Sequence, residues 1–96
     1  APGTRSICDA LLAPEPGALT FEINRRLLAG GLAVSDAEVR TAVAFAARTL
    51  KLVVEPGGAV ALASVLAGKI ESDGRTIAVV LSGGNIDDEL LREVLK

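Results

Sequence analysis

The chain has 96 residues and a formal net charge of −2, and half of its residues are hydrophobic although it has two phenylalanines and no tyrosine or tryptophan. The absence of a basic excess and of aromatic stacking groups argues against nucleic-acid binding, and no apolar run approaches the ~20 residues that a membrane-spanning helix needs. With no histidine, and with Cys8 as its only cysteine, the sequence offers no catalytic triad, metal cluster or internal disulfide; this cysteine usage fits a reducing cytoplasm.

The first third of the chain predicts short elements separated by turns. Ser6 to Leu12 has the pattern of a short helix, which Pro14 stops. Thr20 can cap a second short helix, and Gly30-Gly31 ends it. Leu32 to Val34 then reads as a brief strand.

The middle of the chain predicts two helices. Ser35 and Glu38 form a capping box at the start of the first helix, because each side chain can bond the backbone N–H of the other residue. This helix runs to about Leu50, and its expected buried stripe is Val39, Ala42, Val43, Ala46 and Leu50. Pro56 fits the first turn of the next helix, whose apolar residues are Val60, Ala63, Leu66 and Ala67.

The most informative stretch is an apolar run, Thr76 to Leu81, that leads directly into Ser82-Gly83-Gly84-Asn85. Its length and composition predict a strand buried on both faces, with Val79 in the core. A helix from Asp87 to Leu95 completes a strand-loop-helix unit. Ligands bind beyond the carboxyl ends of parallel strands, so the Ser82 hydroxyl, followed by residues without side chains, stands where a ligand can approach closely.

Glu55 differs from the carboxylates that lie in the first turns of predicted helices and complement the helix dipole, which are Asp36, Glu38, Asp87, Asp88 and Glu89. It follows the apolar Leu52-Val53-Val54 and precedes a helix, which predicts partial burial near a strand end. From the residues alone, a functional role and a simple capping role are equally open. Cys8 has no partner base and is assigned to the core.

A set of motifs occurs in a specific order along essentially the whole chain: Ser6-Ile7-Cys8-Asp9-Ala10-Leu11, Ile23-Asn24-Arg25-Arg26, Val34-Ser35-Asp36, Glu55-Pro56 and Leu81-Ser82-Gly83-Gly84-Asn85. In these residues the chain resembles the C-terminal part of the pyridoxal-phosphate enzymes of fold type II, in particular the threonine and serine dehydratases and the serine racemases. The resemblance implies an α/β fold in which a few parallel strands are flanked by helices. Residues 1–96 would be a single segment, the C-terminal piece of the large, cofactor-binding catalytic domain.

The resemblance also implies a reaction and a site. Enzymes of this kind eliminate the β-hydroxyl of a small hydroxy amino acid to give a 2-oxo acid and ammonia. Ser82 would form a hydrogen bond at the pyridine nitrogen of pyridoxal 5′-phosphate, with Gly83 and Glu55 also at the cofactor. The cofactor-bearing lysine and the glycine-rich phosphate loop of the family have no match here. The chain is therefore expected to hold no catalytic residue, to be inactive alone, and to need the remainder of the parent enzyme, which is expected to be a homo-oligomer.

Two other functions stay open at this point. The chain could be a non-catalytic α/β module that binds another protein through its apolar surface. It could also belong to a fold type II enzyme with a different activity, such as serine racemisation.

Overall fold

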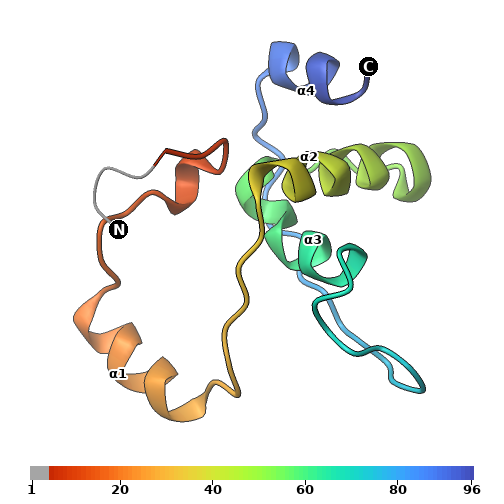
Figure 1. Cartoon of the computed structure of the whole chain (residues 1–96). Coiled ribbons are helices and arrows are strands. Elements are labelled where there is room, and N and C mark those ends of the chain that lie inside the picture. The colour runs from red at the N-terminus through yellow and green to blue at the C-terminus, as the bar shows by residue number, and fades with distance from the viewer. Residues whose placement is uncertain (1–4) are drawn as a thin grey trace.

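The computed structural model describes residues 5–96, and the regular elements in this part of the chain are helical. In chain order they are η1 (Asp9–Leu11), α1 (Ala18–Leu27), α2 (Asp36–Phe45), η2 (Ala46–Leu50), η3 (Pro56–Ala59), α3 (Val60–Leu66) and α4 (Asp88–Val94). Figure 1 shows α2 and α3 packed at the centre, α4 beyond α2, and α1 apart from the other helices. None of the helices in residues 5–96 has the length and apolarity that crossing a membrane requires.

Small aliphatic side chains form the core where α2, α3 and η3 meet. The buried residues of this core are Cys8, Val39, Ala42, Val43, Ala46, Val54, Ala59, Leu62 and Ala63. Alanines at the contact let the helix backbones approach closely, so the core is compact without large rings. The prediction that Cys8 is a core residue is confirmed, because it is 5% exposed.

The helix predicted from the capping box to Leu50 is confirmed, with a change of geometry near its end. Ser35 Oγ accepts from the Glu38 N–H at 3.1 Å, and Glu38 Oε1 accepts from the Ser35 N–H at 2.8 Å. After α2 the chain continues as η2, a π-helix whose wider turn rotates Leu50 outward. Leu50 is 42% exposed, so the prediction that it is buried is wrong.

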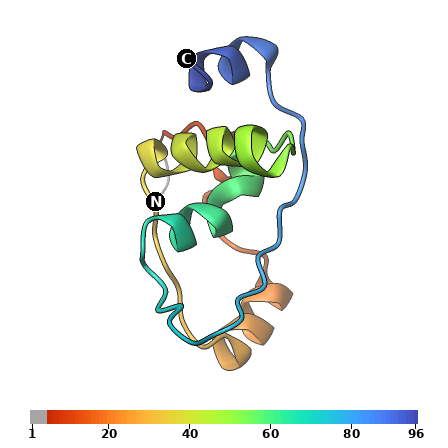
Figure 2. The same cartoon turned by 90° about the vertical axis from the view of Figure 1, so that its right-hand side faces the viewer.

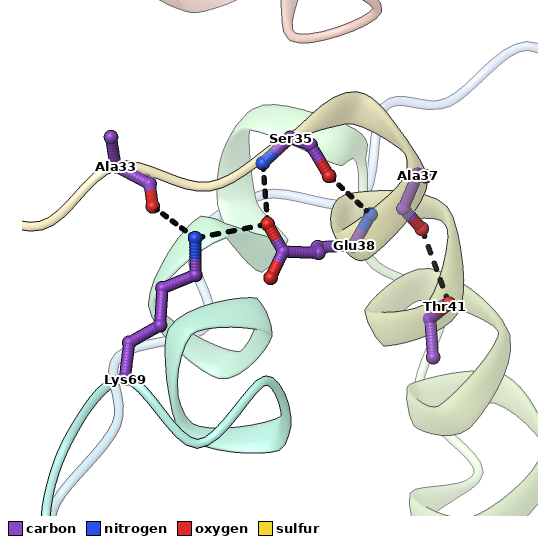
Figure 3. Close-up of polar contacts among 6 residues, drawn as sticks. All are labelled: Ala33, Ser35, Ala37, Glu38, Thr41 and Lys69. Carbon is purple, nitrogen blue, oxygen red and sulfur yellow. Dashed lines mark hydrogen bonds and ion pairs between the residues drawn. The ribbon is translucent and has the colours of Figure 1, made fainter.

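Lys69 joins the start of α2 to the loop that follows α3 (Figure 3). Its Nζ lies 3.0 Å from Glu38 Oε1 and donates to the Ala33 carbonyl oxygen at 2.6 Å. The hydrogen bond from the Ser35 backbone, followed by the contact with Lys69, lowers the pKa of Glu38. The chain entering α2 is thereby fixed to a loop that is distant in the sequence.

This arrangement predicts an acid-sensitive helix start. A lowered pKa in the folded state means that the Glu38 contribution is complete above the pKa of an unfolded glutamate and is lost as pH falls through the folded pKa. We expect Ser35→Ala to lower stability by about 1 kcal/mol at neutral pH and Lys69→Met to weaken the acid dependence. Denaturant titrations of the chain at neutral and acid pH, with Glu71→Gln as control, measure both. An unchanged acid dependence in Lys69→Met would contradict this account.

Two predictions for the first third of the chain need correction. The predicted helix over Ser6–Leu12 is reduced to the single turn of η1, and Gly17, rather than Thr20, is the N-cap of α1. The Thr20 hydroxyl donates to the Gly17 carbonyl oxygen at 3.1 Å, inside the first turn. α1 buries none of its residues, and its apolar side chains Leu19, Phe21, Ile23 and Leu27 are all exposed. In both views it stands away from the core helices (Figures 1 and 2).

The predicted strands are absent from the described part of the chain. Thr76–Leu81 and Leu32–Val34 are not assigned as strands, and no backbone-to-backbone hydrogen bond joins either run to another part of residues 5–96. A strand exists only as one side of a hydrogen-bonded ladder, and these runs do not pair with each other. The α/β architecture that the sequence predicts is therefore not formed by residues 5–96 alone.

The run Thr76–Leu81 nevertheless keeps the alternation of a strand. It passes as an extended trace along one side of the helices toward α4 (Figure 2). Val79 and Leu81 pack against the core, whereas Val80 between them is 75% exposed. Burial on both faces was predicted, but only one face is covered here, and Val79 lies half-buried at the edge of the core. The exposed face carries the apolar side chain that a further layer would cover.

Candidate functional site

The Glu55-Pro56 segment and the Ser82-Gly83-Gly84 loop, separated in the sequence, lie against each other. The Glu55 N–H donates to the Gly83 carbonyl oxygen at 3.1 Å. A Cβ built at Gly84 would lie 2.7 Å from the Val53 carbonyl oxygen, so the two backbones are in direct contact there as well. The structure thus brings together the three residues that the sequence analysis selected, Glu55, Ser82 and Gly83.

Pro56 and Glu55 shape one side of this contact. Pro56 occupies the first turn of η3, as predicted, where its fixed φ fits and its missing N–H is not needed. The Gly58 N–H donates to the Glu55 carbonyl oxygen at 3.0 Å and closes the turn. Glu55 precedes this turn in an extended conformation and is half-buried, as predicted.

Gly83 forms the other side. Its φ of 78° lies in the left-handed region, where a side chain is strained. A Cβ at Gly83 would also collide with the Glu55 carboxylate. The backbone conformation therefore favours glycine at this position, and any side chain here would also displace the Glu55 carboxylate.

Ser82 stands at the end of the extended run with its side chain on the surface. It is exposed, and within residues 5–96 its hydroxyl makes no hydrogen bond. Gly83 and Gly84, which follow it, are exposed, so a flat group could approach the hydroxyl from the solvent side of the loop. Such a hydroxyl can donate one hydrogen bond and accept others.

A separate cleft of about 500 Å³ is lined by residues that include Cys8, Ser6 and Asp36, but neither Glu55 nor the glycine loop. The Asp36 carboxylate accepts from Ser6 Oγ at 2.6 Å and from the Ile7 N–H at 3.2 Å, so each of its two oxygens already has a hydrogen-bond donor. Burial is the main cause that raises the pKa of the Cys8 thiol. A thiol with a raised pKa is a poor nucleophile.

No group of three or more cysteine, aspartate and glutamate residues within residues 5–96 could hold a metal ion.

The contact between the two segments also includes Gly58, Gly84 and Val53, which the sequence analysis did not select. The Gly57-Gly58 pair after Pro56 is a signal in the sequence, but nothing in the sequence indicates that Gly58 faces the Ser82 backbone.

Comparison with known proteins gives one family match. Residues 1–83 match the model of the family described as "Pyridoxal-phosphate dependent enzyme". The match spans the Glu55-Pro56 segment and ends within the glycine loop.

Curated relatives cover almost the whole chain. It is 34% identical over 93 residues to an L-threonine ammonia-lyase of Thermotoga maritima, and the matched region covers 97% of this chain and 23% of the relative. It is 36% identical over 86 residues to the catabolic L-threonine dehydratase of Escherichia coli K12, with 88% of this chain and 26% of the relative covered. An L-threo-3-hydroxyaspartate ammonia-lyase of a Pseudomonas species is 34% identical, over 95% of this chain and 28% of its own length. The chain thus spans about a quarter of the length of these relatives.

Proposed function

The chain belongs to the family of pyridoxal-phosphate dependent enzymes, and from this premise we propose that it is the C-terminal part of a threonine/serine dehydratase. The whole enzyme would eliminate the β-hydroxyl of a small hydroxy amino acid to give a 2-oxo acid and ammonia. The names of the relatives, threonine and 3-hydroxyaspartate ammonia-lyases among them, support elimination over racemisation. The observation that carries the proposal is the contact of Glu55 with the Ser82-Gly83 loop.

The residues at this contact fit one edge of pyridoxal phosphate. Ser82 supplies an exposed hydroxyl, and the absence of a side chain at Gly83 lets the Glu55 carboxylate lie against the loop. Glu55 supplies a half-buried carboxylate on the adjacent segment. We propose that the Ser82 hydroxyl forms a hydrogen bond with the ring nitrogen, and that Gly83 and Glu55 border the ring.

The bound cofactor supplies an electron sink that stabilises negative charge at the substrate α-carbon. Ser82 would tune that sink, because a neutral hydroxyl, unlike a carboxylate, does not hold a proton on the ring nitrogen. A weaker sink favours loss of the β-hydroxyl over transamination. Glu55 and Gly83 would keep Ser82 in place through the hydrogen bond from the Glu55 N–H to the Gly83 carbonyl oxygen.

The remainder of the parent enzyme is the partner that we propose for the exposed apolar surfaces. α1 exposes apolar side chains, and Val80 exposes the outer face of the run Thr76–Leu81. Covering strands and helices would complete the α/β sheet that residues 5–96 do not form alone. The cofactor-bearing lysine would also come from that remainder, so we propose that this chain by itself is inactive.

Ser82→Ala tests the proposed function in the whole protein. One hydrogen bond worth about 1 kcal/mol is removed, so we expect nearly unchanged folding and roughly five- to tenfold slower elimination of threonine or serine. Ser82→Asp should be slower still, because a carboxylate would favour a protonated ring nitrogen. Ser72→Ala, which removes an exposed hydroxyl remote from the contact, is the control in steady-state assays of 2-oxo acid. Parent-like kinetics in both Ser82 variants would make Ser82 only a turn residue.

A further inference from the structure

Gly58 is buried in η3, directly opposite the backbone of Ser82. A Cβ built at Gly58 would collide with the Ser82 carbonyl oxygen. It would also lie 2.8 Å from the Ser82 carbonyl carbon and 3.2 Å from the Gly83 carbonyl oxygen. All three are backbone atoms, so no side chain can rotate away to make room. A side chain at position 58 must therefore move the loop that carries Ser82.

The adjacent Gly57 has no such neighbour. A Cβ built there would lie 3.5 Å from the Ala10 Cβ and 3.6 Å from the Leu11 Cγ, which are ordinary contact distances. Neither Gly57 nor Gly58 has a positive φ, so alanine fits the backbone conformation at both positions. The two glycines share one turn and differ in what faces them.

The position of the Ser82 hydroxyl depends on this backbone contact. Within residues 5–96 no side chain bonds to that hydroxyl. The loop is instead held by the hydrogen bond from the Glu55 N–H to the Gly83 carbonyl oxygen and by the close approach to Gly58. A displaced backbone would carry the hydroxyl with it.

We propose that Gly58 is a positioning residue, which sets the place of the Ser82 hydroxyl at the cofactor ring by admitting the Ser82 backbone against its Cα. This rests on the proposed function of Ser82. Gly58 itself would touch neither cofactor nor substrate. Its effect on the cofactor would pass through the Ser82-Gly83 loop.

The test compares Gly58→Ala with Gly57→Ala in the whole protein. We expect Gly58→Ala to weaken pyridoxal phosphate binding about tenfold or more, because a small misplacement of a contacting group is costly. In the cofactor-free protein, hydrogen exchange at the Glu55 amide should accelerate, since its acceptor on Gly83 moves. Gly57→Ala should match the parent in both the cofactor titration and the exchange rate. Parent-like cofactor binding in Gly58→Ala would overturn the proposal.

The double variant Gly58→Ala/Ser82→Ala separates positioning from general damage. If Gly58 acts through Ser82, the double variant loses less affinity than the sum of the two single losses, whereas fully additive losses overturn the proposal. A Ser82→Ala variant with parent-like affinity would instead refute the proposed role of Ser82 and the positioning proposal with it. Should Gly58→Ala not fold, the cofactor-free parent decides. A slowly exchanging Glu55 amide supports the contact, and an unprotected amide overturns the proposal.

Discussion

Val79→Asp is expected to abolish cooperative unfolding of the isolated chain. Val79 packs against the core at its edge, and a carboxylate there would have to enter apolar surroundings without a partner. That penalty amounts to several kcal/mol, which is a large share of the ~5–15 kcal/mol that stabilises a domain. Thermal melting followed by circular dichroism, together with sedimentation equilibrium, measures the effect.

Val80→Asp is the matched control for this experiment. Val80 is the next residue in the same extended run, but its side chain is 75% exposed, so in the isolated chain the variant should melt like the parent. In the whole protein the two variants should become alike, because we propose that further strands and helices cover the outer face. Equal melting of both variants in the isolated chain would show that the run does not lie on the core by one face. If Val80→Asp left the melting of the whole protein unchanged, it would contradict the proposal that further strands and helices cover the outer face of this run.

Gly83→Ala is expected to cause the largest loss of cofactor affinity. An alanine at a φ of 78° costs about 1–2 kcal/mol of backbone strain. Its Cβ would also meet the Glu55 carboxylate, which must move out of its place beside the loop. We therefore expect pyridoxal phosphate binding in the whole protein to fall by about a hundredfold, measured by equilibrium titration.

Gly74→Ala isolates the strain from the contact. Gly74 has a φ of 69°, and a Cβ there would have nothing within 4 Å, so the substitution carries the backbone cost alone. The free energy of unfolding of Gly74→Ala should fall by about as much as that of Gly83→Ala. The cofactor affinity of Gly74→Ala should stay near that of the parent. Equal cofactor affinity in the two variants would show that the space beside Glu55 has no role in binding.

The local signals of the sequence predicted local structure well. The capping box of Ser35 and Glu38, the place of Pro56 in a first turn and the burial of Cys8 are confirmed, because each depends on neighbours in the chain or on side-chain hydrophobicity. The exposure of Leu50 could not be predicted, since η2 departs from the α-helical period on which the buried stripe was based. The contact of Lys69 with Ala33 and Glu38 left no signal, because its partners are far apart in the sequence.

The sequence by itself indicated the family and most of the helices, and it selected the residues of the candidate site, because propensity, capping and motif order are properties of the linear sequence. Only the tertiary structure decided how these residues meet: that Gly58 faces the Ser82 backbone, and that Glu55 lies over Gly83. It also decided that the apolar run Thr76–Leu81 is covered on one face alone. An apolar run specifies a surface to be buried, but a strand needs a second backbone for its hydrogen bonds, and residues 5–96 supply none.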